Sequence, residues 1–396
     1  MRGMFSQVWT VVVMNILSLP RRLWMSLAAV LAVGVVVASL LAFLAMAKGF
    51  EQTLAGTGTD SIAIVTRTGS QSELNSVLSR NTVNLISNAP GIAQDAAGDP
   101  DYSAELYVIV DGVKRSTQTE ANIPMRGISP KGFDLREQID IVEGRMFEEG
   151  RNEIVVGAGV GREFSGFEVG REIRFGKTAW EVVGVFSTGG SAFESELWAD
   201  APTVQSQFQR GSSFQTVRLR LEQPGDVEPI REYVENDPQL VLDVDTEADF
   251  FASQGEALNG IAIFGWILSA VMGLGALAGA LNTMYTSVAS RAREIATLRA
   301  LGFSNVSAFA GTLAESLVLS VIGGVVGALA AWLFFDGFSA STLSASFTQV
   351  VFTFELTPEL FQNGILLALT IGLLGGLFPA WRAARLPVVL AFQGGE

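Results

Sequence analysis

The sequence predicts an α-helical membrane protein with four transmembrane helices and a large, two-lobed extracytoplasmic α+β domain inserted between helices 1 and 2. Three observations lead to this prediction. Long uncharged apolar stretches flank one densely charged stretch, basic residues gather in the short segments between apolar stretches, and strand and helix patterns fill the charged stretch. The average composition, 49% apolar over 396 residues, would by itself also suit a soluble protein.

The first apolar run, Leu23–Ala47, contains 25 residues without a charge. At about 1.5 Å of rise per residue it is longer than the roughly 30 Å hydrocarbon layer, and longer than the apolar core of a cleaved signal peptide. Three further runs follow the charged stretch. The expected segments are an interfacial amphipathic helix (1–22), transmembrane helix 1 (23–47), the extracytoplasmic domain (48–257), transmembrane helix 2 (258–285), a cytoplasmic helical segment (286–304), transmembrane helix 3 (305–335), an extracytoplasmic loop (336–359), transmembrane helix 4 (360–382) and a cytoplasmic tail (383–396).

Arginine residues indicate the orientation. The loop 336–359 has three acidic residues and neither Lys nor Arg, so the positive-inside rule places it, with the large domain, outside the cytoplasm. Both chain termini and the segment between spans two and three are then cytoplasmic, in a bacterial inner membrane. The arginines that support this orientation are Arg2, Arg21, Arg22, Arg291, Arg293, Arg299, Arg382 and Arg385.

Charge and residue usage exclude several functions. Residues 48–257 carry 18 Lys and Arg against 34 Asp and Glu, which argues against a nucleic-acid partner because phosphates require basic residues. The chain has no Cys and no His. Thiol nucleophiles, disulfides, Cys or His zinc sites and Ser–His–Asp chemistry are therefore excluded. We predict no catalytic, metal-binding or cofactor-binding residue in this chain.

The charged stretch is predicted to be a mixed α and β domain whose β-rich middle forms one lobe. Short segments of alternating or β-branched residues between glycine-containing turns indicate strands, and serine starts or proline at the first turn indicate helices. Strands are expected at Ser61–Thr66, Ala104–Val110, Glu153–Val156, Glu172–Phe175, Trp180–Phe186 and Thr216–Leu221, and helices at Ser72–Ser87, Pro202–Phe208 and Asp226–Glu235.

Gly176-Lys177-Thr178 superficially resembles the end of a phosphate-binding loop. Such a loop needs a glycine five positions before Gly176, where this chain has Arg171. The three residues also lie between two short β segments rather than at the start of a helix. A hairpin turn is the expected structure, and the chain is not expected to hydrolyse ATP unaided.

The segment Ser290–Gly302 carries the most functional information. Val288, Ala292, Ile295 and Leu298 lie on one helical face, with Arg and Glu residues around it, and Gly302 is suited to end the helix. A short charged helix between two spans could receive a push from a cytosolic partner. A simple positive-inside anchor is the alternative, although that role does not need a helix–glycine–helix arrangement.

The predicted spans themselves contain few residues that could carry function. Glu315 lies about one-third of the way into span three, where an ionised group costs about 3 kcal/mol on insertion scales. A carboxylate that is paired near the cytoplasmic end, or protonated, is expected rather than a proton relay, because no second ionisable group lies at membrane depth. Pairs of small residues are expected to permit close helix packing, and these are Gly275 and Gly279, Gly323 and Gly327, and Gly372 and Gly376.

The order of one span, a large external domain and three spans resembles the permease subunits of the MacB/FtsX/LolC superfamily of ABC transporters (type VII). The motifs that carry the resemblance are Arg-Glu-Ile-Ala-Thr-Leu-Arg-Ala-Leu-Gly at 293–302, Glu315, Gly-Gly-Val-Val-Gly at 323–327, Pro-Ala-Trp-Arg-Ala-Ala-Arg at 379–385, and, in the domain, Gly-Arg-Met-Phe at 144–147, Glu-Ile-Val-Val-Gly at 153–157 and Val-Val-Gly-Val at 182–185. The resemblance is to MacB-like members, but without a fused ATPase domain.

This resemblance implies a homodimer, or a heterodimer with a sister permease, that binds a separate cytosolic ATPase holding ATP and Mg²⁺. Segment 286–304 would be the coupling helix, with Arg291, Arg293, Glu294, Ile295, Leu298, Arg299, Leu301 and Gly302 as its ATPase-coupling residues. It further implies export by mechanotransmission, in which ATP hydrolysis moves the external domain. The implied partners also include membrane lipid and, where the cell has two membranes, a periplasmic adaptor and an outer-membrane channel. The alternatives are an FtsX-like regulator of an extracytoplasmic hydrolase and a LolC-like extractor of lipoprotein or lipid.

Overall fold

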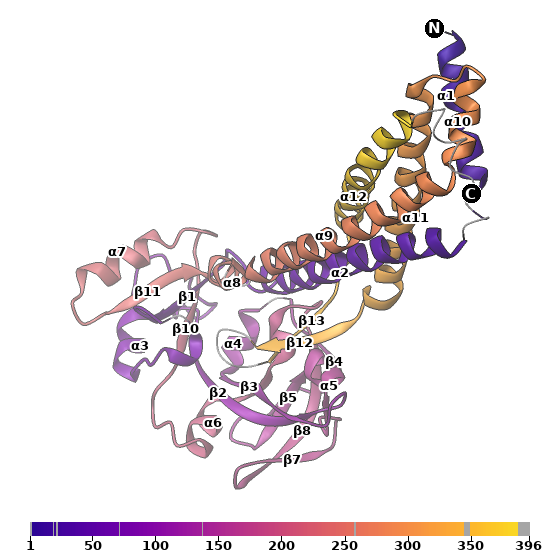
Figure 1. Cartoon of the computed structure of the whole chain (residues 1–396). Coiled ribbons are helices and arrows are strands. Elements are labelled where there is room, and N and C mark those ends of the chain that lie inside the picture. The colour runs from indigo at the N-terminus through magenta and orange to yellow at the C-terminus, as the bar shows by residue number, and fades with distance from the viewer. Residues whose placement is uncertain are drawn as a thin grey trace. The chain divides into compact units, whose positions relative to one another are not determined.

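The computed structural model describes residues 2–18, 20, 23–70, 72–136, 138–256, 259–343 and 349–386. The chain divides into two compact units (Figure 1). The helical unit comprises Met1–Lys48, Asn259–Phe338 and Phe354–Glu396. The sheet unit comprises Gly49–Leu258 and Ser339–Thr353.

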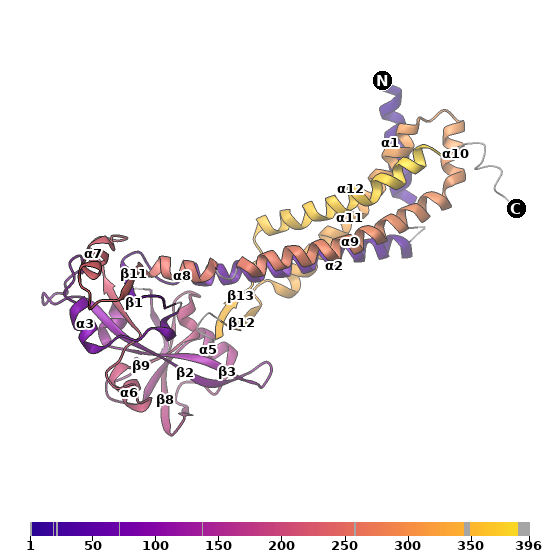
Figure 2. The same ribbon diagram turned by 60° about the vertical axis from the view of Figure 1, so that its left-hand side comes forward.

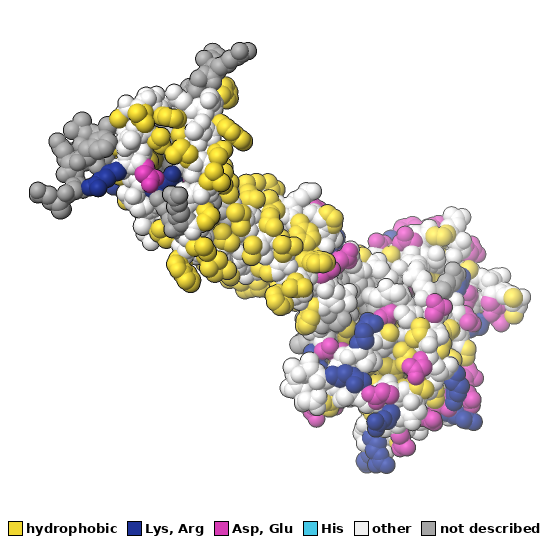
Figure 3. Space-filling view, turned by 90° about the vertical axis from the view of Figure 1, so that its right-hand side faces the viewer, with side chains coloured by type: hydrophobic (Ala, Val, Ile, Leu, Met, Phe, Trp, Pro, Cys, Tyr) yellow, Lys and Arg dark blue, Asp and Glu magenta, His cyan; other side chains and the backbone are white. Residues whose placement is uncertain are grey.

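Four helices among the described residues are long and apolar enough to cross a membrane, namely α2 (Leu23–Ala55), α9 (Asn259–Ser290), α11 (Asn305–Phe335) and α12 (Pro358–Ala384). Helix α12 packs beside both α9 and α11 (Figure 2). Large apolar side chains on α9 and α11, such as Ile267 and Leu333, are exposed, as expected of helices that face lipid. In Figure 3 hydrophobic side chains gather over the helical unit and charged ones over the sheet unit. The helical unit also contains α1 (Arg2–Ser18) and α10 (Ala292–Ala300).

The main sheet of the sheet unit has the strand order β11-β1-β10-β2-β3-β9-β5-β8-β4, with β6 beside β2 and β7 beside β8. The strands are β1 (Ile62–Arg67), β2 (Tyr102–Lys114), β3 (Glu120–Ile128), β4 (Asp140–Gly144), β5 (Glu153–Gly157), β6 (Phe164–Ser165), β7 (Glu172–Phe175), β8 (Thr178–Ser187), β9 (Leu197–Asp200), β10 (Thr216–Arg220) and β11 (Leu242–Thr246). The helices are η2 (Glu73–Asn75), α3 (Arg80–Ile86), α4 (Pro130–Asp134), α5 (Ala158–Glu163), η3 (Ala192–Ser195), α6 (Ala201–Gln207), α7 (Glu228–Asn236) and α8 (Glu247–Glu256).

Two separate hydrophobic cores divide the sheet unit into two lobes. The first core lies among β1, β10, β11, α3 and α7 and includes Val65, Ile86 and Ile230. The second lies among β2, β3, β5, β8 and β9 and includes Trp180 and Val156. Strand β2 belongs to both lobes, because its start pairs with β10 and the rest of it pairs with β3. The predicted fold, four spans plus a two-lobed α+β domain, is confirmed.

The strands and helices predicted within residues 48–257 are confirmed except at one place, and the predicted external loop contains structure of its own. The helix predicted at Ser72–Ser87 is wrong, because the chain forms the single turn η2 and then the separate helix α3, whose cap is Ser79 rather than Ser72. The segment 336–359, predicted to be a loop, contains the antiparallel strands β12 (Ser339–Leu343) and β13 (Gln349–Thr353). Gly176 and Lys177 form the hairpin turn between β7 and β8, where Phe175 pairs with Thr178.

Candidate functional site

Helix α10 is separated from the long helices before and after it by two local signals. Arg291 interrupts the helical path after α9, with φ −105° and ψ 11°. At the other end Gly302 adopts φ +96°, a left-handed conformation that favours glycine. The N–H of Phe303 bonds to the carbonyl of Leu298, and the N–H of Gly302 to that of Arg299, which is the Schellman pattern of helix termination. Ser304 then caps α11 through the N–H of Ser307.

The guanidinium of Arg291 ties the start of α10 to two other helices, α1 and α11. It donates to Glu315 Oε2 on α11 at 3.1 Å, to Asn15 Oδ1 on α1 at 2.5 Å and to Glu294 Oε2 on α10 at 3.1 Å. Ser287 on α9 donates to the other oxygen of Glu315 at 3.2 Å. The Arg291 and Glu315 side chains are only 8% and 5% exposed. A buried ion pair is tolerated only when both charges are paired and hydrogen-bonded, as they are here.

The end of α10 is held by further polar contacts. Gln7 of α1 donates to the carbonyl of Gly302 at 3.5 Å and accepts from the N–H of Ser304 at 3.2 Å. Arg299 donates to the carbonyl of Leu386, just beyond α12. Both ends of α10 are therefore bound to other helices of the helical unit.

The two faces of α10 differ. Ile295 and Leu298 are half-buried and, with Val11 and Val288, line a cavity of about 290 Å³, which Glu294 and Thr297 also border. The outer face of α10, defined here as Arg293, Glu294, Thr297 and Leu301, is exposed. Leu301 is 73% exposed, a large apolar side chain beside charged ones. Such a mixed surface suits contact with another protein.

The predicted glycine pairs lie in different surroundings. A side chain added at Gly323 or Gly327 of α11 would collide with backbone atoms of Val30 or Gly34 of α2. One added at Gly372 or Gly376 of α12 would collide with Ser320 or Ser316 of α11, and Ser316 donates to the Gly372 carbonyl at 2.8 Å. These four glycines therefore lie at close helix contacts. Gly275 and Gly279 of α9 have no atom of the described residues within 4 Å of an added Cβ atom.

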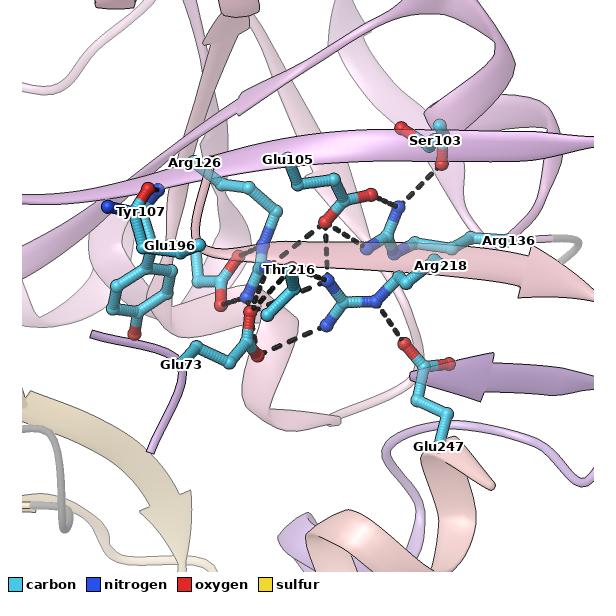
Figure 4. A network of polar contacts seen from close by, with 12 residues as sticks. Glu73, Ser103, Glu105, Tyr107, Arg126, Arg136, Glu196, Thr216, Arg218 and Glu247 are labelled. Atoms are coloured by element: carbon cyan, nitrogen blue, oxygen red, sulfur yellow. Dashed lines mark hydrogen bonds and ion pairs between the residues drawn. The ribbon is translucent and has the colours of Figure 1, made fainter. Parts of the chain in front are cut away.

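A buried cluster of charges in the sheet unit was missed by the sequence analysis (Figure 4). Its members are the four carboxylates Glu73, Glu105, Glu196 and Glu247 and the three guanidiniums Arg126, Arg136 and Arg218, here called the ion network. Arg126 on β3 binds Glu73, Glu105 and Glu196 at 2.5 to 3.0 Å. Arg218 on β10 binds Glu73, Glu105 and Glu247 at 2.5 to 3.1 Å. Since β10 belongs to the first lobe and β3 to the second, the ion network joins the two lobes, and Glu247 extends it to the first residue of α8.

Electrostatics keep Glu105 and Glu73 ionised. Burial alone would raise the pKa of Glu105, but the charges of Arg136, Arg218 and Arg126 outweigh burial and lower it to about 2. Burial opposes ionisation of Glu73 in the same way, and Arg126 and Arg218 hold its pKa well below the usual range. No local sequence pattern indicates this network, because its members are single charged residues scattered along the chain: Glu105 and Arg218 lie in predicted strands and Glu73 in the predicted helix 72–87. Among the described residues no group of three Asp or Glu side chains is placed to hold a metal ion.

Apolar spanning helices, a two-lobed sheet domain and a short charged helix between two spans define the class, a multi-pass membrane transport subunit. A family model described as "MacB-like periplasmic core domain" matches residues 26–237, and one described as "FtsX-like permease C-terminal" matches 266–388. The chain belongs to the MacB/FtsX family of ABC transporter permeases.

The chain is similar to several curated relatives and solved structures. The ABC transporter permease YknZ of Bacillus subtilis (strain 168) is 25% identical over 80% of this chain and 79% of its own length. The macrolide export ATP-binding/permease protein MacB 1/2 of Paracoccus denitrificans is 28% identical over 71% of this chain, which spans only 43% of that longer protein. Among solved structures, the extracellular domain of YknZ aligns with a TM-score of 0.34 at 16% identity, covering 46% of this chain and 98% of that one. The periplasmic region of MacB from Actinobacillus actinomycetemcomitans aligns with a TM-score of 0.36 at 16% identity, covering 48% and 91%.

Proposed function

We propose that this chain is the transmembrane subunit through which a separate cytosolic ATPase, with its own ATP and Mg²⁺, moves the sheet unit and so drives export. In this proposal α10 is the coupling helix and the ATPase binds its outer face. Both termini and α10 are cytoplasmic, and the sheet unit lies outside the membrane. A homodimer or a heterodimer with a sister permease completes the transporter.

The observation that carries the proposal is the set of contacts made by Arg291. A helix that received force at its exposed face would pass it on only if its buried side were firmly attached. Arg291 supplies that attachment to α1 and α11 at once, and its side chain is 8% exposed. A plain positive-inside anchor would need the positive charge but none of these buried partners.

The test changes two residues of the outer face and leaves Arg291 and its buried partners in place. Arg293→Glu combined with Leu301→Asp replaces two exposed residues, and the chain is co-expressed with its candidate ATPase and purified in nanodiscs. We expect the unaltered chain to retain the ATPase and the variant to lose it, with unchanged thermal stability. Lys177→Glu, in the exposed β7–β8 turn, is the matched charge-reversal control and should retain the ATPase.

Retention of the ATPase and of ATP-dependent export by the double variant would contradict the assignment of α10. Failure of any ATPase to co-purify with the unaltered chain would contradict the wider proposal. Activation of a wall hydrolase, or release of lipoprotein, instead of export would favour the FtsX-like or LolC-like alternative.

A further inference from the structure

The strands β12 and β13 lie between two membrane-spanning helices in the sequence but belong to the sheet unit. They pair in antiparallel register from Ser339 with Thr353 to Leu343 with Gln349. The chain therefore enters the sheet unit a second time, and α11 and α12 are each joined to it directly. An isolated two-stranded hairpin is marginally stable in water, so its contacts with the rest of the sheet unit decide whether it is rigid.

The first attachment is apolar and buried. Phe352 of β13 is 2% exposed, and its ring meets the ring of Phe50 edge-on at 5.4 Å between centroids. Phe50 lies in the part of α2 that belongs to the sheet unit. The neighbouring Val351 is 5% exposed, and its N–H donates to Ser195 Oγ at 2.8 Å. Ser195 precedes Glu196, so this attachment lies one residue from the ion network.

The second attachment is polar and involves the second lobe. Lys114, the last residue of β2, donates to Ser341 Oγ of β12 at 2.8 Å. Ser341 in turn donates to Glu163 Oε1 of α5 at 3.1 Å. The Lys114 and Glu163 side chains are 17% and 15% exposed. Both strands of the hairpin are therefore fastened to the sheet unit.

At its base the hairpin continues as paired backbone inside the helical unit. The N–H of Phe354 donates to the carbonyl of Phe338 at 2.9 Å, and the N–H of Gly337 to the carbonyl of Phe354 at 3.1 Å. The Phe354 ring stacks on Phe335, the last residue of α11, with 6.0 Å between centroids. Three residues, 336–338, separate the end of α11 from the start of β12, and so short a connection absorbs less movement than a long flexible linker.

We propose that the β12–β13 hairpin is a second mechanical connection, in which Phe352, Ser195 and Lys114 are positioning residues that make the second lobe follow α11 and α12 during transport. The inference rests on the proposed function and adds to it. Movement of the membrane helices would reach the sheet unit through the hairpin as well as through α2 and the chain that leads from α8 to α9.

The test compares two buried phenylalanines of the same unit. Phe352→Ala removes the hairpin contact, whereas Phe214→Ala removes a 6% exposed ring from the first lobe and leaves the hairpin untouched. In the chain alone, in nanodiscs, we expect hydrogen exchange in β13 to become about 100-fold faster in Phe352→Ala only, which corresponds to about 3 kcal/mol. In the complex with the ATPase, we expect Phe352→Ala to lose export while ATP hydrolysis continues, and Phe352→Leu to restore it.

A second variant keeps the test decisive if Phe352→Ala fails to express or does not release the hairpin. Replacing 339–353 by a Gly/Ser linker of equal length removes the hairpin altogether, and we expect the same uncoupling. ATP-driven export that persists with a released or replaced hairpin overturns the inference. A loss of export in Phe214→Ala as large as that in Phe352→Ala also overturns the inference. The exchange measurement needs no ATPase, so a failure of the proposed function is distinguishable from a failure of the hairpin inference.

Discussion

Replacing Arg218 by Met tests whether the ion network holds the sheet unit together. Arg218 is fully buried, and its guanidinium contacts Glu247 at 2.6 Å, Glu105 at 2.5 Å and Glu73 at 3.1 Å. Methionine keeps much of the side-chain volume but removes the charge. Glu105 and Glu73 retain other arginine partners, whereas among the described ion pairs of the network Glu247 pairs with Arg218 alone. The variant therefore leaves a buried carboxylate without its cation.

The expected loss of stability in Arg218→Met is large. Removing one member of a buried ion pair costs about 3–5 kcal/mol, because the remaining charge is desolvated without compensation. For a unit of roughly 150–250 residues, each kcal/mol shifts Tm by about 2–4 °C, so Arg218→Met should lower the Tm of the sheet unit by roughly 6–20 °C. Thermal unfolding of the purified full chain, followed by near-ultraviolet circular dichroism and by hydrogen exchange in β10, measures this change.

Two further variants serve as controls for Arg218→Met. Arg231→Met removes a 40% exposed guanidinium from its pair with Glu228, so the free energy of unfolding should change by about 1 kcal/mol or less. Adding Glu247→Gln to Arg218→Met removes the stranded charge and should recover part of the loss, with a coupling energy of about 0.5–3 kcal/mol. If Arg218→Met is no more destabilising than Arg231→Met, the network does not have the structural role assigned to it.

Two other predictions concern charge in both units. Because the folded-state pKa of Glu105 is about 2 against an ordinary value of 4.5, its contribution to the free energy of unfolding is fully present above pH 4.5. That contribution, about 3 kcal/mol, should be lost as the pH falls from 4.5 to 2. Unfolding of the sheet unit measured at a series of pH values checks this; a free energy of unfolding that stays constant over that range would contradict the lowered pKa of Glu105. In the helical unit, Arg291→Met strands the Glu315 carboxylate and should speed hydrogen exchange in α10, while adding Glu315→Gln should slow it again. Equal exchange in the single and double variants would show that the pair does not anchor α10.

Several features could be predicted from the sequence because they depend on local composition. Twenty-five uncharged residues in one run are sufficient to indicate a membrane span wherever the rest of the chain lies. Gly302 and Ser304 mark the end of one helix and the start of the next, and the structure places both signals where their chemistry requires them. The pattern of 293–302 and the order of spans and domain were sufficient to indicate the family.

The ion network and the hairpin attachment could be decided only by the tertiary structure. Glu105, Arg126 and Arg218 lie on three strands whose neighbours in the sheet are set by long-range pairing, and nothing local to any of them indicates burial. The split of Ser72–Ser87 has a similar cause, since Glu73 bonds to Arg126 and Arg218 instead of continuing a helix. Segment 336–359 has the acidic, Lys- and Arg-free composition of an external loop, which predicts its side of the membrane but carries no information about the surface on which Phe352 is buried. Membrane spans and helix ends depend on residues that are neighbours in the sequence. Burial of a charge or an aromatic ring depends on partners that only the folded chain brings together.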